Sequence, residues 1–199
     1  MAFQKVQRKA AKMRVAVAGP SGAGKTLSAL YLAFGVTQDW EKIALIDTEH
    51  GRGQFYGNRS DLEVGEYLYQ ELDPPFTVER YIAMAKEAEQ AVGPDGVIII
   101  DSFSHAWEGE GGVLDFKELT EQQQGKNSFT AWNDAGKKQN ILINTLLSLN
   151  AHVIVTMRTK MAYAMEQNDR GKTVPVKIGL APVQRENTEY EFDLVFNIA

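Results

Sequence analysis

The segment from Gly19 to Thr26 reads GPSGAGKT and matches the pattern G-x-x-x-x-G-K-[S/T]. Glycines at this spacing let backbone N–H groups turn toward phosphate oxygens at the start of a helix. We therefore expect Lys25 to contact the β- and γ-phosphates of a nucleoside triphosphate, and Thr26 to ligate Mg²⁺. The other nucleotide-binding residues expected in this segment are Gly19, Pro20, Ser21, Gly22, Ala23, Gly24 and Leu27.

Two acidic residues stand where predicted strands end. Asp101 closes the apolar run VIIID, and Glu49 follows a second apolar run at 43–46. The carboxyl ends of parallel strands meet at one edge of a sheet, where ligands bind. We expect Asp101 to hold Mg²⁺ through water and Glu49 to orient a water for attack on the γ-phosphate. The alternatives are a turn cap for Asp101 and a surface acid in a loop for Glu49.

The pattern along the chain predicts the elements that hold these side chains. Strands alternate with helices, which predicts an α/β fold with a mostly parallel central sheet flanked by helices. The β-rich segments VPVKIGL and EYEFDLVFNI have no helix between them, so we expect C-terminal antiparallel strands. The apolar strand patterns lie at 14–18, 43–46, 97–100 and 151–158, and the helical patterns at 26–36, 76–92 and 131–149.

The chain reads as one core, residues 13–199, preceded by a basic N-terminal arm at 1–12. Two long connections, near 104–130 and 159–188, are expected to be loops, and loops of this length are usually functional or mobile. The second is basic and leaves the sheet at the edge where the phosphates are expected. Aromatic residues in or beside the first are expected in the core or at an interface more than against nucleobases: Trp107, Phe116, Phe129 and Trp132.

Composition bounds the class of protein. The chain has 199 residues, 44% of them hydrophobic and 24% charged, which suits a globular core. A net charge of −5 argues against a surface coated in positive charge for nucleic acid. There is no cysteine for disulfides, no apolar run long enough to span a bilayer, and no secretory signal pattern. We therefore expect a cytoplasmic protein with no membrane partner.

Several motifs resemble those of RecA-type recombinases. LIDTEH at 45–50 is similar to their strand-end motif, VIIIDS at 97–102 resembles their second magnesium motif, and VIVTMRTK resembles the strand that opens their second DNA-binding loop. AGPSGAGKT and the tail PVQRENTEYEFDLVF resemble small phage-encoded, RecA-core ATPases classed with single-strand annealing proteins. The resemblance implies a RecA-like fold, ATP and Mg²⁺ as ligands, Glu49 as the residue that activates water, and Tyr56 stacked on adenine.

The resemblance also implies partners and cationic residues. It implies a ring or filament of identical subunits acting on single-stranded DNA in a bacterial host cytoplasm, beside a single-strand DNA-binding protein. Arg158 is expected to act at the phosphates from within its own subunit, whereas Lys177 and Arg185 lie where they can reach a neighbouring subunit. The DNA-binding candidates are Lys160, Arg170, Lys172 and Lys177, with Tyr163 as a base-stacking residue.

Two positions depart from the recombinase pattern. Thr156 stands where a glutamine senses the γ-phosphate, and Gly53 stands where recombinases have an acid. No room remains for a further DNA-binding domain. Annealing or a loader role therefore fits the sequence better than full strand exchange.

Other nucleotide-binding classes leave different signatures. A GTPase is disfavoured because the chain has no N-K-x-D motif. A small-molecule kinase remains a rival, since residues 158–185 can imitate an arginine-rich lid. A nucleotide-controlled assembly switch with little turnover is the third reading. We take an ATPase, stimulated by single-stranded DNA, as the prediction.

Overall fold

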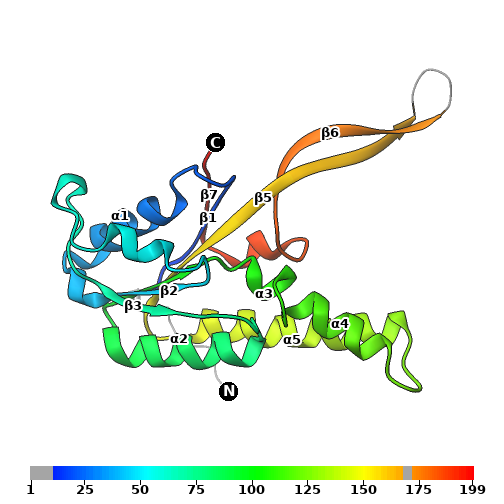
Figure 1. The fold of residues 1–199 in the computed structure, drawn as a ribbon, viewed down its shortest axis with the longest axis horizontal. Helices are drawn as coiled ribbons and strands as arrows, with labels where there is room; N and C mark the ends of the chain where they lie inside the picture. The colour runs from blue at the N-terminus through cyan, green and yellow to red at the C-terminus, as the bar shows by residue number, and fades with distance from the viewer. Residues whose placement is uncertain (1–10, 168–171) are drawn as a thin grey trace, which may run out of the picture.

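A seven-stranded sheet forms the centre of the molecule (Figure 1). The structure is a computed structural model and describes residues 11–167 and 172–199. Its strands are β1 (Arg14–Gly19), β2 (Ile43–Asp47), β3 (Leu68–Glu71), β4 (Val97–Asp101), β5 (His152–Gln167), β6 (Thr173–Pro182) and β7 (Leu194–Asn197). Its α-helices are α1 (Lys25–Thr37), α2 (Val78–Val92), α3 (His105–Glu108), α4 (Val113–Glu121) and α5 (Ser128–Ser148).

The strand order brings the chemical residues to one edge. The order is β3-β2-β4-β5-β1-β7, and each neighbouring pair in it is parallel. The register sets Asp47 opposite Asp101, and Gly19 opposite Arg158. The predicted α/β fold with a parallel sheet is thus confirmed, and the glycine loop and both acidic strand ends share the carboxyl edge.

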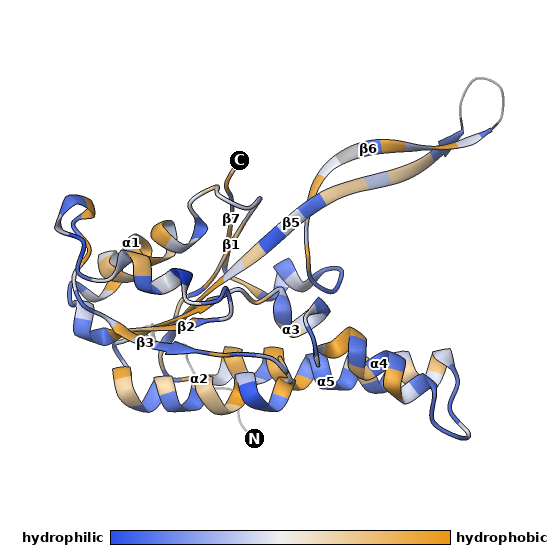
Figure 2. Ribbon diagram, in the orientation of Figure 1, coloured by the Kyte–Doolittle hydropathy of each residue, from blue (hydrophilic) through white to orange (hydrophobic). Residues whose placement is uncertain are grey.

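Two apolar cores, one on each face of the sheet, explain the unbroken apolar runs. Within β4, Ile98 and Ile100 belong to the core packed by α2 and α5, whereas Val97 and Ile99 belong to the core packed by α1. Successive strand residues point to opposite faces, so a strand covered on both sides needs apolar residues at every position. Figure 2 shows hydrophobic colour along the strands inside the body.

The two connections expected to be loops have regular structure instead. Residues 104–130 contain α3, α4 and the start of α5. The sequence pattern did not predict α3 and α4, because short helices have too few turns to show a helical period. Residues 159–182 belong mostly to a hairpin, in which β5 continues past the sheet and pairs antiparallel with β6. The segment MAYAM alternates as a strand does. The basic residues and glycines around it are typical of a loop, and they led to the prediction of a loop. This arm projects from the body in Figure 1.

The C-terminal strands pair with different partners. The expected antiparallel pairing holds for β6, which runs against β5 from Thr159 opposite Pro182 outward. In contrast, β7 is parallel to β1 and forms an edge of the sheet. Residues 1–10 of the predicted basic arm lie outside the described residues. In the described part of the chain, no helix has the length and apolarity needed to cross a bilayer.

Candidate active site

The glycine loop joins β1 to α1 with the geometry expected of a phosphate-binding loop. Gly22 and Gly24 have φ angles of 81° and 87°, a left-handed conformation that side-chain-bearing residues rarely adopt. A Cβ at Gly19 would lie 2.6 Å from the carbonyl oxygen of Ile198, so this close approach also needs glycine. Lys25 Nζ donates to the carbonyl of Pro20 at 2.8 Å, which holds the lysine across the loop.

A cavity of 560 Å³ opens beside this loop and gathers most of the predicted site. Pro20 and Ala23 belong to the loop and Leu27 to α1, but none of these three lines the cavity, and neither does Gly19. The lining residues predicted from sequence are Ser21, Gly22, Gly24, Lys25, Thr26, Glu49, Tyr56, Asp101 and Arg158. Burial lowers the pKa of Lys25, against the opposing charges of Asp101 and Glu49.

Thr26 and Asp101 meet inside the cavity and form a donor set that suits Mg²⁺. Thr26 Oγ1 donates to Asp101 Oδ2 at 2.5 Å, and Asp101 Oδ1 accepts from the hydroxyl of Thr156. Burial raises the pKa of the Asp101 carboxyl, while both hydroxyls oppose that rise. A hydroxyl and a carboxylate oxygen fit a hard cation that takes its remaining ligands from water and phosphate.

The same contact assigns Thr156 a supporting role. Its side chain is fully buried behind the cavity lining, and its hydroxyl donates a hydrogen bond to Asp101. In this structure Thr156 therefore positions Asp101 and does not line the cavity. The sensor position suggested by the recombinase pattern does not face the cavity in this chain.

Glu49 is held by Arg158 at both carboxylate oxygens. Arg158 Nε donates to Oε1 at 2.8 Å and Nη2 donates to Oε2 at 2.5 Å. Burial acts to raise the pKa of Glu49, but the hydrogen bonds and charge of Arg158 outweigh burial and lower it. The bonds to Glu49 likewise raise the pKa of Arg158. The carboxylate is ionised and inside the cavity, with both oxygens occupied by a guanidinium.

A buried carboxylate shapes the turn that presents Glu49. Asp47 Oδ1 accepts from Glu49 N at 2.5 Å, and Asp47 Oδ2 accepts from Gly53 N at 2.7 Å. A Cβ at Gly53 would lie 2.5 Å from Leu45 Cδ2. A side chain at Gly53 therefore requires Leu45 to shift, and it would also crowd the Asp47 carboxylate.

Three cavity residues escaped the sequence analysis. Arg52 and Phe55 lie on the short 3-10 helix Arg52–Tyr56 that also presents Tyr56, and Thr159 follows Arg158 on β5. Thr159 Oγ1 is buried and has no hydrogen-bond partner among the described residues. No motif marked these residues. Thr159 offers a free hydroxyl where Thr156 does not.

The remaining predicted cations lie outside this cavity. Arg185 and Lys160 line a separate cavity, and Lys177 is exposed on β6 opposite Tyr163. Lys172 is exposed immediately before β6, and Arg170 lies outside the described residues. The structure thus places Arg158 in the cavity beside the glycine loop and Arg185 outside that cavity.

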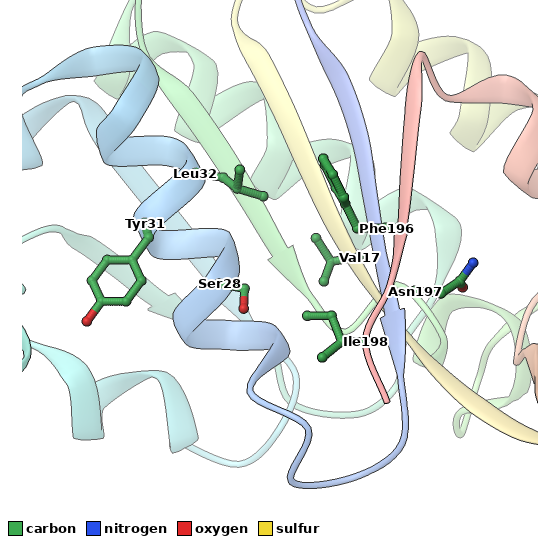
Figure 3. A pocket seen from close by; sticks show the side chains of 7 residues that line it. All are labelled: Val17, Ser28, Tyr31, Leu32, Phe196, Asn197 and Ile198. Atoms are coloured by element: carbon green, nitrogen blue, oxygen red, sulfur yellow. The ribbon is translucent and has the colours of Figure 1, made fainter.

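A third cavity, drawn in Figure 3, lies between α1 and the β1–β7 edge. It has a volume of 440 Å³, and most of its lining is apolar, including Val17, Leu32 and Phe196. Its tyrosine, Tyr31, donates its hydroxyl to the carbonyl of Leu62. This lining has no charged group for phosphate chemistry.

Comparison with known families gives one match. A family model described as an AAA domain matches residues 11–199, nearly the whole chain. A search of curated proteins found no match.

Proposed function

The chain belongs to the AAA domain family, and on that premise we propose that it is a Mg²⁺-dependent ATPase whose turnover is controlled by single-stranded DNA. Membership of the family makes the chain a P-loop, nucleotide-binding ATPase domain. The observation that supports hydrolysis is the position of Glu49, whose carboxylate lines the same cavity as Lys25 and Thr26. Binding of a nucleotide alone does not require such a carboxylate.

In this proposal the chain's own residues do most of the work at the phosphates. Lys25 exchanges its bond to the Pro20 carbonyl for phosphate oxygens, and Thr26 and Asp101 hold the ion. Bound Mg²⁺ neutralises charge on the β- and γ-phosphate oxygens. Glu49 takes a proton from water while the water oxygen bonds to the γ-phosphorus. The bond from that phosphorus to the bridging oxygen breaks, which releases ADP and phosphate.

Arg158 sets the resting state. Because its guanidinium occupies both oxygens of Glu49, that carboxylate accepts no proton from water until Arg158 moves. Arg158 and the γ-phosphate share the cavity, so the phosphate competes with Glu49 for the guanidinium. Arg158 lies at the point where β5 leaves the sheet, opposite Gly19 of the glycine loop. In this proposal a movement of the hairpin shifts Arg158 and thereby changes its contact with Glu49.

Single-stranded DNA is proposed as the controlling ligand for two reasons. The motifs resemble RecA-type recombinases and small phage-encoded annealing ATPases, and the hairpin beyond Arg158 carries Lys160 and Lys177 in exposed positions. Lysines neutralise DNA phosphates and release counterions. We extend the proposal to annealing or loading by a homo-oligomer, ring or filament, beside a single-strand DNA-binding protein.

Replacement of Glu49 tests the hydrolytic step. Glu49→Gln is expected to bind a fluorescent ATP analogue normally and to lower kcat about 10²- to 10⁴-fold, the range for loss of a general base. Phosphate release measures kcat. Glu41→Gln, an exposed glutamate outside the cavity, is the matched control and is expected to retain the parent rate. A Glu49→Gln enzyme that hydrolyses ATP at the parent rate rules out water activation by Glu49.

The Glu49–Arg158 pair also favours a second candidate, an assembly switch with little turnover, because the pair blocks the base. Phosphate release with oligothymidine, with duplex DNA and without DNA separates the two candidates. The ATPase proposal expects single strands to raise kcat above the DNA-free rate. The switch expects a slow rate unchanged by DNA, together with ATP-dependent change in sedimentation.

A further inference from the structure

A second polar cavity lies at the base of the hairpin and shares no lining residue with the ATP cavity. It has a volume of 690 Å³, within the usual range of small-ligand clefts. Trp107 comes from α3, Trp132 and Gly136 from α5, and Lys160 from β5. The proposed ATPase chemistry uses no residue of this cavity. We therefore ask which ligand its lining residues fit.

Two indole rings form an aromatic wall. The centroids of Trp107 and Trp132 are 6.4 Å apart, with an angle of 29° between the ring planes. Trp107 packs against the core, whereas Trp132 is 47% exposed, although a large aromatic gains most from burial. Lys117 Nζ lies 5.3 Å from the centre of the Trp132 ring. The wall is thus packed against the core at Trp107 and open to solvent at Trp132.

Two cations flank the wall without tight carboxylate partners. Lys160 lies 3.9 Å from Glu108, at the limit of an ion pair, and its side chain is 69% exposed. Arg185 donates to Asn140 Oδ1 at 2.8 Å and forms no ion pair within the described part of the chain. Glu186 is the acid in the lining. The two cations are available for an anionic ligand.

The polar floor of the cavity is already satisfied. Gln184 Oε1 accepts from Gln139 Nε2 at 2.8 Å and from Arg185 N at 2.9 Å, and Gln184 Nε2 donates to the carbonyl of Phe103 at 3.1 Å. This side chain is therefore not free to read the donor and acceptor pattern of a ligand. The rest of the lining offers the amide of Asn187 beside flat aromatic surface and positive charge, and the latter two suit stacking that is indifferent to base identity.

We propose that this cavity binds an unpaired nucleobase of a single-stranded nucleic acid, stacked on Trp132, with Lys160 and Arg185 on the flanking phosphates. The inference rests on the proposed function and locates its DNA contact. It also supplies a route to hydrolysis. Lys160 is two residues from Arg158, so a strand that draws Lys160 outward displaces the guanidinium that occupies Glu49.

Anisotropy of labelled oligothymidine tests the stacking contact. Trp132→Ala is expected to weaken binding about 5- to 150-fold, and Trp132→Phe, which keeps an aromatic face, is expected to recover most of the affinity. Trp40→Phe is the control, because Trp40 stacks on Phe34 in a different part of the molecule. Binding of a fluorescent ATP analogue, unchanged in every variant, reports that each protein is folded.

Salt dependence tests the two cations. Lys160→Ala and Arg185→Ala are each expected to reduce the slope of log K against log salt by about 0.7, the value for one contact to a single strand. Lys137→Ala on α5, whose lysine pairs with Asp134, is the matched control and is expected to keep the slope.

Three outcomes overturn the inference. If the parent protein binds oligothymidine and Trp132→Ala binds it equally well, the cavity is not the site and the proposed function stands. If the parent protein binds ATP but no oligothymidine, the DNA part of the proposed function fails as well. If a short acidic, aromatic peptide binds in a Trp132-dependent manner and oligothymidine does not, the cavity serves a protein ligand.

Discussion

At the scale of single residues, the balance of burial and charge at Glu49 governs the chemistry. Burial alone disfavours the ionised carboxylate, and Arg158 more than offsets it. The lowered pKa stabilises the native state above the ordinary pKa of glutamate, and this stabilisation is lost as pH falls through the lowered value. The same arginine that keeps Glu49 ionised also keeps it from accepting a proton. Release of Arg158 both frees the base and strengthens it.

Removal of Arg158 is expected to raise the pKa of Glu49, because burial remains and its opponent is gone. In Arg158→Ala the acidic limb of kcat against pH is therefore expected to move to higher pH. Phosphate release measured from acid to neutral pH gives the limb. Arg52→Ala is the comparison, since Arg52 lines the same cavity and lowers the pKa of Glu49 by its charge alone and less than Arg158 does; it is expected to move the limb in the same direction by a smaller amount. An unmoved limb in Arg158→Ala shows that Glu49 does not control the acidic limb.

At the scale of elements, the turn after β2 is built around the space at Gly53. The Asp47 carboxylate accepts hydrogen bonds from the backbone of Glu49 and Gly53, and a methyl group at Gly53 requires the Leu45 side chain to shift. The position of the base thus depends on a packing contact as much as on its own strand. Sequence motifs report the base and not this contact.

Gly53→Ala is expected to destabilise the fold by about 1–3 kcal/mol, the usual cost of overpacking. Urea unfolding measures the change. Gly35→Ala is the matched control: nothing lies within 4 Å of its added methyl, and Gly35 is inside α1. There the same substitution is expected to stabilise by about 1 kcal/mol, through helix propensity. Equal effects at the two positions contradict the packing account of Gly53.

At the scale of the whole molecule, the hairpin arm is separable from the body. No residue from Met161 to Gln167 belongs to either apolar core, and the arm extends away from the sheet in Figure 1. Hydrophilic colour marks the point where β5 leaves the body in Figure 2. Both polar cavities meet β5 at that point, at Arg158 and Thr159 on one hand and Lys160 on the other. The base of the arm therefore connects the cavity beside the glycine loop with the cavity lined by Trp132.

Excision of the arm tests this arrangement. Lys160 and Ala181 are opposite one another, so an Asn-Gly turn joining them replaces residues 161–180 and closes a short hairpin. The shortened protein is expected to keep its melting temperature and ATP affinity, since the core is intact. Because Trp132, Lys160 and Arg185 all remain, it is expected to keep most stimulation of phosphate release by oligothymidine. Loss of stimulation without the arm places the DNA contact or its coupling in residues 161–180.

Residue patterns along the chain were enough to predict the sheet, the glycine loop and the two acids at its edge. Unbroken apolar runs require cover on both faces, and glycines before Lys25 and Thr26 permit few backbone conformations, so local residue patterns suffice. The predictions of loops at 104–130 and 159–188 were wrong for two reasons. Helices α3 and α4 have too few turns to show a helical period, and the strands of the hairpin lie outside the cores and so lack the pattern of a buried strand.

The contacts between distant side chains follow from the folded structure. Glu49 and Arg158 are far apart in sequence, and their pairing follows from the β2, β4 and β5 order and register. That register also turned Thr156 toward Asp101 and left Thr159 in the cavity. Local sequence sets what each strand buries. Contact between strands depends on the packing of the entire sheet, which no single segment encodes.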